Sequence, residues 1–249
     1  MPFTLLHTRY QSAGIVPPPY AHFYELTARP GATGGVQVDF SITYIDRETL
    51  DEEDITGEGF TLTDNFSWSG TLGGAWLTVL ETLVVATALD PFNEARLGDA
   101  DAFLEVTIEQ NETKTSGTPT HTDAFLYPVQ ELIQATYEAG GKEKPFELRY
   151  CHYRQQQDLE LLVQAVFADR HLTLTVVENR REDRRTLPWA MLKPLMGRVF
   201  AHDYDPAESL AKPPRRDGHF LNIGAAEWYD IHALPDVQQA MTELMAPVK

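Results

Sequence analysis

Apolar and polar residues alternate with a period of two along much of this chain, which predicts a protein built mainly from β-strands. The clearest case is the segment 36–44, where every even-numbered residue is apolar and every odd-numbered residue is polar. A strand with one packed face and one wet face is typical of an antiparallel sheet. We therefore expect Phe40 and Ile42 to be buried, and Asp39 and Ser41 to be exposed.

Two hairpins are predicted. Leu159–Ala168 and His171–Glu178 flank Asp169-Arg170, which has the length of a two-residue turn. Pairing about this turn would set three apolar pairs on one face: Phe167 with Leu172, Ala165 with Leu174, and Val163 with Val176. The other hairpin joins Tyr20–Thr27 to the segment 36–44 through a glycine-rich linker. Further strand candidates are Phe3–Tyr10, Phe60–Trp68, Phe103–Glu109, Phe146–Tyr153 and His219–Ile223.

Five segments carry helix signals, which are apolar stripes at helical spacing or terminal residues that favour helix ends. They are Thr49–Gly57, Gly74–Leu89, Tyr127–Ala139, Leu187–Phe200 and Leu234–Met245. Thr49 and Glu52 have the spacing of a capping box, and Pro194 predicts a kink or an early end in the fourth helix. We expect an α+β fold, which is a mainly antiparallel sheet built from hairpins and meanders with about five helices packed on it.

The chain is long enough for one large domain or two small ones. We expect a single α+β domain over residues 1–249. The alternative is an acidic N-terminal half, residues 1–140, followed by a near-neutral C-terminal half, residues 145–249. Each half begins with three strand candidates and later reaches a helix that bears a tryptophan, which suggests a duplication without any repeated residue string.

The two halves of the chain differ in net charge. The chain has 37 acidic and 20 basic residues, and residues 1–144 hold 22 of the acids but only 7 of the bases. A dense negative field attracts basic partners and repels nucleic acid and anionic lipid. We therefore expect a basic protein partner, no direct binding to nucleic acid and no membrane association. The predicted partner-binding residues are Asp51, Glu52, Glu53 and Asp54, and the oligomeric state stays open.

The sequence offers no signature of catalysis. Cys151 is the only cysteine, so an internal disulfide is impossible. It lies in a strand-like run, where His152 would point to the opposite face and could not serve it as a base. No stretch has the ~20 apolar residues that a bilayer span needs. The N-terminus also lacks the pattern of a signal peptide, so we expect a soluble, cytoplasmic protein.

One cluster suggests a metal. His202, Asp203 and Asp205 combine imidazole and carboxylate ligands within four residues, which would suit Zn, Mn or Fe. In an extended segment His202 would face away from the two carboxylates, so a single metal would not easily take all three. This cluster carries the alternative function, a metal-dependent hydrolase, and a divalent metal is the only cofactor that any pattern here suggests.

One basic cluster stands out in the second half of the chain. It consists of Arg180, Arg181, Arg184 and Arg185, with Glu182 and Asp183 between them. The cluster either grips a phosphate or carboxylate, or forms a solvated loop whose charges pair locally. Taken together, these patterns favour a non-catalytic binding or assembly protein that uses an acidic N-terminal surface to engage a basic partner.

Overall fold

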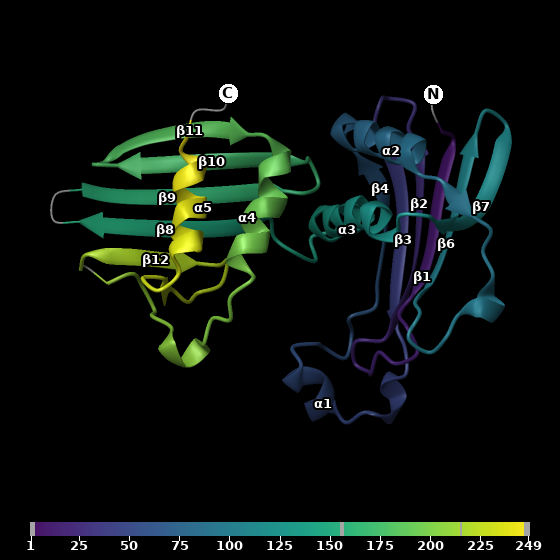
Figure 1. Cartoon of the computed structure of the whole chain (residues 1–249), viewed down its shortest axis with the longest axis horizontal. Helices are drawn as coiled ribbons and strands as arrows, with labels where there is room; N and C mark the ends of the chain where they lie inside the picture. The colour runs from purple at the N-terminus through teal and green to yellow at the C-terminus, as the bar shows by residue number, and fades with distance from the viewer. Residues whose placement is uncertain (1–2, 155–156, 215, 247–249) are drawn as a thin grey trace. The chain divides into compact units, whose positions relative to one another are not determined.

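A computed structural model of the chain describes residues 3–154, 157–214 and 216–246. It contains two antiparallel sheets with helices packed on them (Figure 1), which confirms the predicted α+β class. The chain divides into two compact units, Met1–Lys142 and Glu143–Lys249. We call them the first unit and the second unit. Whether they fold as one domain or two stays a prediction.

The first unit contains a seven-stranded antiparallel sheet. Its first four strands form a meander that grows outward from β1: β1 (Leu5–Gln11), β2 (His22–Pro30), β3 (Val36–Tyr44) and β4 (Phe66–Leu72). β6 then pairs with the other side of β1, so the strand order is β4-β3-β2-β1-β6-β7-β5. The remaining strands are β5 (Leu89–Asp90), β6 (Phe103–Gln110) and β7 (Thr113–Pro119).

Two helices cover the apolar face of this sheet, as Figure 1 shows: α2 (Gly74–Ala86) and α3 (Thr122–Ala139). Trp76 of α2, Leu132 of α3 and Val38 of β3 are fully buried. Three shorter helices lie in connections: η1 (Arg47–Thr49), α1 (Glu52–Gly57) and η2 (Glu94–Arg96). None of the helices in the described residues combines the length and the apolar character needed to cross a membrane.

The alternation in β3 has the predicted effect. Phe40 and Ile42 are buried beneath the helices, and Ser41 on the other face is exposed. Asp39 is only half-exposed, because Arg29 and Ser69 on the neighbouring strands contact its carboxylate. The face assignment is therefore confirmed, with Asp39 partly covered by its cross-strand partners.

The second unit contains a six-stranded antiparallel sheet with the order β11-β10-β9-β8-β12-β13. Its strands are β8 (Phe146–Arg154), β9 (Gln157–Val166), β10 (His171–Glu178), β11 (Arg181–Leu187), β12 (Gly218–Asn222) and β13 (Tyr229–Asp230). Figure 1 shows α4 (Leu192–Val199) and α5 (Pro235–Leu244) lying across the strands. Two short helices lie in connections: η3 (Trp189–Met191) and η4 (Pro206–Glu208).

The predicted register of the β9–β10 hairpin is wrong by two residues. The observed pairs are Ala165 with Leu172, Val163 with Leu174, and Leu161 with Val176. The turn has four residues instead of two, because Arg170 adopts a left-handed conformation and its amide donates to the carbonyl of Phe167. A shift of two keeps every side chain on its original face, so the apolar face was still predicted correctly.

The helix ends predicted from Pro194 and Pro128 are wrong. Pro194 does not break α4, because the helix begins at Leu192 and places Pro194 in the first turn, where no intrahelical N–H bond is lost. α3 does not begin near Pro128 but at Thr122, so Pro128 lies inside it. The buried side chains of Phe125 and Val129 on either side hold that part of α3 against the core.

Two further elements, α1 and β4, do not begin or end where the sequence predicts. The capping box does not form, since Asp51 is the N-cap residue of α1 and Thr49 belongs to η1. Strand β4 begins at Phe66 and runs through Gly70 to Leu72, so it starts and ends later than predicted.

The two units share one topology. Each has four meandering strands, then a helix, then strands that pair with the free side of the first strand, then a long final helix. β1, β2 and β3 thus correspond to β8, β9 and β10, and β6 corresponds to β12. The topology agrees with the duplication that the sequence suggests.

Phe40→Ala should lower the free energy of unfolding by about 3–5 kcal/mol, because a ring that is 3% exposed would leave a cavity under the helices. Urea denaturation measures the change. The matched control is Ser41→Ala on the open face, which should change the value by less than about 0.5 kcal/mol. Equal effects at the two positions would contradict the assignment of faces.

Candidate functional site

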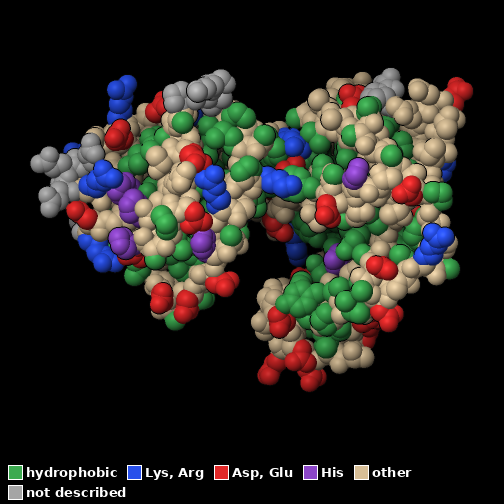
Figure 2. Space-filling model, viewed as in Figure 1, with side chains coloured by type: hydrophobic (Ala, Val, Ile, Leu, Met, Phe, Trp, Pro, Cys, Tyr) green, Lys and Arg blue, Asp and Glu red, His purple; other side chains and the backbone are tan. Residues whose placement is uncertain are grey.

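Nearly half of the carboxylate surplus of the first unit lies in one lobe. We call residues 46–64 the acidic lobe; it contains η1 and α1 and connects β3 to β4. Its nineteen residues include eight acids and one base, Arg47. Seven exposed carboxylates of the lobe make no ion pair with another described residue. Four are the predicted partner-binding residues, Asp51, Glu52, Glu53 and Asp54, and the others are Asp46, Glu48 and Glu58. Figure 2 shows carboxylates gathered over the end that carries α1.

Arg47 holds this lobe together. Its Nη1 donates to Asp64 Oδ2 at 3.0 Å, and its Nη2 donates to the carbonyl of Pro19 at 2.8 Å. The guanidinium also lies over the rings of Tyr44 and Phe60, at 4.0 and 4.7 Å from their centroids. The only basic side chain of the lobe is therefore used within it, and the exposed carboxylates stay unneutralised.

Apolar side chains are exposed beside these carboxylates. Leu62 is 60% exposed, and Tyr20 is 43% exposed while its ring packs edge-on against Phe60. The hydroxyl of Tyr20 donates to Glu58, which ties the loop before β2 to the lobe. Figure 2 shows hydrophobic side chains together on the surface of this end of the unit. The lobe thus offers apolar contact and negative charge side by side.

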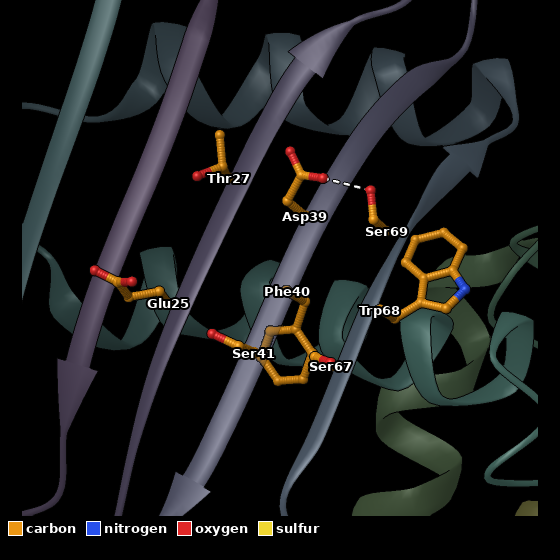
Figure 3. Close-up of a pocket in the computed structure, with 8 residues that line it drawn as sticks. All are labelled: Glu25, Thr27, Asp39, Phe40, Ser41, Ser67, Trp68 and Ser69. Atoms are coloured by element: carbon orange, nitrogen blue, oxygen red, sulfur yellow. Dashed lines mark hydrogen bonds between the residues drawn. The ribbon is translucent and has the colours of Figure 1, made fainter.

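The open face of the first sheet carries a shallow cavity (Figure 3). A cavity of about 330 Å³ is lined by Glu25, Thr27, Asp39, Phe40, Ser41, Ser67, Trp68 and Ser69. Asp39 accepts a hydrogen bond from Ser69 at 2.5 Å, and Arg9 pairs with Glu25. The eight lining residues include no histidine or cysteine, so their serines have no base to activate them. The charges of this face pair with one another across the strands.

The structure gives the predicted metal ligands separate positions. His202 Nε2 lies 2.9 Å from Asp236 Oδ2 in the first turn of α5, and the hydrogen bond from His202 holds the pKa of Asp236 below its ordinary value. Asp205 is the N-cap residue of η4 and accepts from the amide of Ala207. Asp203 is exposed. Across the described residues, no three His, Cys, Asp or Glu side chains come together to hold a metal ion.

The four arginines of the basic cluster belong to a hairpin. Arg180 lies in the turn before β11, and the other three lie on β11, an edge strand of the second sheet. Successive side chains of a strand point to opposite faces, so Arg184 and Arg185 point apart. Arg185 Nη2 donates to the carbonyl of Leu244 at the end of α5, where a cation also offsets the helix dipole. These arginines do not converge on one point.

A cluster that sequence reasoning missed lies in the second unit. His152 of β8 is paired directly with His219 of β12, and their rings stack with centroids 3.9 Å apart. The hydroxyl of Tyr150 is hydrogen-bonded to His219 Nδ1 at 2.7 Å, and Arg154 Nε donates to His152 Nε2 at 2.9 Å. Because a guanidinium can only donate, His152 Nε2 must accept, so the proton of this neutral ring is on Nδ1.

The surroundings keep both imidazoles uncharged. Burial is the main cause that lowers the pKa of His219, and the nearby His152, Arg154 and His232 add to the lowering. Asp230 opposes it, and the resulting pKa is about 4. Burial also lowers the pKa of His152. At neutral pH the cluster is therefore a set of neutral donors and acceptors beside one guanidinium.

The sequence held only a weak signal for this cluster. Alternation places residues 150, 152 and 154 on one face of a predicted strand, but the pairing of β8 with β12 brings His219 from a distant part of the chain. Cys151 points to the other face, as predicted, and is buried. Burial raises the pKa of its thiol to about 11, so it is protonated at neutral pH.

Comparisons with protein-family models, with curated proteins and with solved structures found no match to this chain.

Asp64→Asn should destabilise the protein by about 1–3 kcal/mol at neutral pH, because Asp64 accepts charged hydrogen bonds within the lobe. Burial acts to raise the pKa of Asp64, but bonds from Thr61 and Arg47 outweigh it, so this pKa lies below its ordinary value. The stabilisation is thus present above the ordinary pKa and is lost as the pH falls through the lowered one. Urea denaturation at several pH values checks this, with Asp54→Asn as the control.

The histidine cluster should make the protein less stable as the pH falls from about 7 to about 5. The unfolded chain takes up protons near pH 6.5, whereas folded His219 resists protonation until about pH 4, and the pKa of folded His152 is also lowered. His219→Gln should reduce this loss, measured as the shift in the urea midpoint between the two pH values. His171→Gln, at an exposed histidine, is the control. An unchanged loss in His219→Gln would refute the proposed cause.

Proposed function

We propose that this protein is a non-catalytic binding or assembly protein whose acidic lobe engages a basic protein partner. The observation that carries the proposal is the coincidence, on one lobe, of seven exposed carboxylates without ion-pair partners among the described residues and exposed apolar side chains. Charge of one sign selects the class of partner, and apolar area supplies affinity that charge alone does not.

The charge distribution supports this choice of surface. Residues 1–142 hold 21 acids and 6 bases. On the open sheet face, Arg9 and Arg29 are paired with carboxylates, whereas Arg47 is the only base of the lobe and is enclosed within it. The exposed surface of the lobe therefore carries several carboxylates and no free base. The negative field of such a surface speeds encounter with a cationic partner and falls off within about 8 Å at physiological ionic strength.

The apolar side chains restrict the partner further. Leu62 and Tyr20 are exposed at the lobe, so the matching segment should carry apolar residues among its lysines and arginines. A purely cationic polymer would satisfy only the carboxylates.

The alternative function is a metal-dependent hydrolase with a site at His202, Asp203 and Asp205. It remains a hypothesis drawn from the sequence, and no contact of these residues favours it.

The lobe variant Glu52→Gln, Glu53→Gln, Asp54→Asn tests this proposal. The probes are a 16-residue peptide of alternating lysine and leucine and an oligolysine with the same number of lysines. The lobe variant should bind the first peptide roughly tenfold more weakly, which is about 1.4 kcal/mol. Raising the salt concentration should weaken the wild type more than the variant. Fluorescence anisotropy measures both effects.

A second triple variant separates the lobe from net charge. Glu94→Gln, Glu112→Gln, Asp123→Asn removes the same three charges at exposed positions elsewhere in the first unit. Its affinity for the lysine–leucine peptide should stay within about twofold of the wild type, since screened charges beyond a Debye length contribute little. Leu62→Ser should remove the preference for that peptide over oligolysine. Equal weakening in the two triple variants would overturn the proposal.

A further inference from the structure

A cavity of about 480 Å³ opens between α5 and the sheet of the second unit. The strands contribute Tyr150, His152 and His219 to it, and α5 contributes Gln238 and Thr242. Its volume lies in the range of small-molecule pockets, which is roughly 300–1,000 Å³. Figure 1 shows α5 lying across the strands on this side of the sheet.

The floor of the cavity is one row of residues on four adjacent strands. Strand pairing places His219 beside His152, His152 beside Leu159, and Leu159 beside Glu178. Adjacent strands are about 4.8 Å apart, so Glu178 lies roughly 10 Å from His152 along the row. The row therefore has imidazoles at one end, an apolar middle and a carboxylate at the other end.

A positive charge lies next to the imidazole end of this floor, and a negative charge lies at its other end. Arg154 lies beyond His152 on β8, and Glu178 ends β10. Both side chains are exposed at the rim, and neither forms an ion pair with another described residue. Arg154 uses its Nε on His152, which leaves the Nη groups for other acceptors. The α5 side chain of Gln238 is held in place by bonds to the carbonyls of Ile231 and His232.

The first unit shows that this topology does not require a cavity. The row of Val106, Thr8, Leu26 and Phe40 crosses β6, β1, β2 and β3, the strands that correspond to β12, β8, β9 and β10. All four residues are buried under the helices. The second unit instead places imidazoles, a guanidinium and a carboxylate around open space. Such polar groups are costly to keep beside a core unless they have partners.

We propose that this cavity binds a small ligand with an oxyanion, a phosphate or a carboxylate, at one end and an ammonium or hydroxyl donor at the other. The Nη groups of Arg154 would hold the oxyanion, with an imidazole N–H as a further donor. Glu178 would accept from the far end, and Leu159 would contact the apolar middle. Strand β8, which carries Arg154, and strand β10, which carries Glu178, are roughly 10 Å apart, and a ligand of about that length would join the two groups.

Matched probes test the two ends of the ligand separately. 6-Aminohexanoate carries a carboxylate and an ammonium at opposite ends, and hexanoate carries the carboxylate alone. Glucosamine 6-phosphate carries a phosphate and an ammonium, and glucosamine carries the ammonium alone, so this pair tests the oxyanion end. At least one two-ended probe should bind at least tenfold more tightly than its one-ended partner by calorimetry, and the better of the two identifies the oxyanion. Binding should also shift the ring resonances of His152 and His219.

Three variants assign the contacts. Arg154→Gln should weaken the better two-ended probe at least tenfold. Glu178→Gln should reduce its affinity to that of the probe that keeps only its oxyanion, hexanoate or inorganic phosphate. Arg149→Gln is the control, because Arg149 lies on the opposite face of β8 and pairs with Glu147. It should bind like the wild type. Thermal unfolding of each variant shows whether it is folded.

The proposal fails if no probe at 10 mM shifts the ring resonances of His152 or His219 in the wild type. It also fails if Arg149→Gln weakens binding as much as Arg154→Gln does. All of these measurements concern the second unit and do not depend on the acidic lobe.

Discussion

The burial of one face of each antiparallel sheet under helices is the constraint on which the rest of this structure depends. Alternating residues such as Val38 and Phe40 leave water together with Trp76 and Leu132, and this burial is the main favourable contribution to folding. Every strand then presents its other residues to the opposite face. The polar face of the first sheet, with its paired charges around Asp39, is a direct consequence.

The same topology is used in two ways. In the first unit the central row under the helices is buried and includes Thr8 and Leu26. In the second unit the corresponding strands bring His152 and His219 together beside an open cavity. A polar cluster of this kind opposes the tendency of a core to close. We therefore regard the cavity as a feature of the second unit's side chains and not of the fold.

The acidic lobe shows how one buried cation can organise an anionic surface. Arg47 joins the Pro19 carbonyl, Asp64 and the rings of Tyr44 and Phe60, so the loops of the lobe pack around a single guanidinium. Because this charge is enclosed, it neutralises one carboxylate and leaves the exposed ones unpaired. The lobe can thus be locally ordered and strongly negative at the same time.

The sequence by itself determined the class of fold, the buried face of β3 and the surplus of acid in the first half, because alternation and composition are local properties. It missed the β9–β10 register, which depends on the turn conformation at Arg170. Only the tertiary structure decided which distant residues meet. The β8–β12 pairing joins His152 to His219, and the packing of α5 brings the carbonyl of Leu244 to Arg185. Pairing between distant strands is set by the whole core, so no local pattern can reveal it.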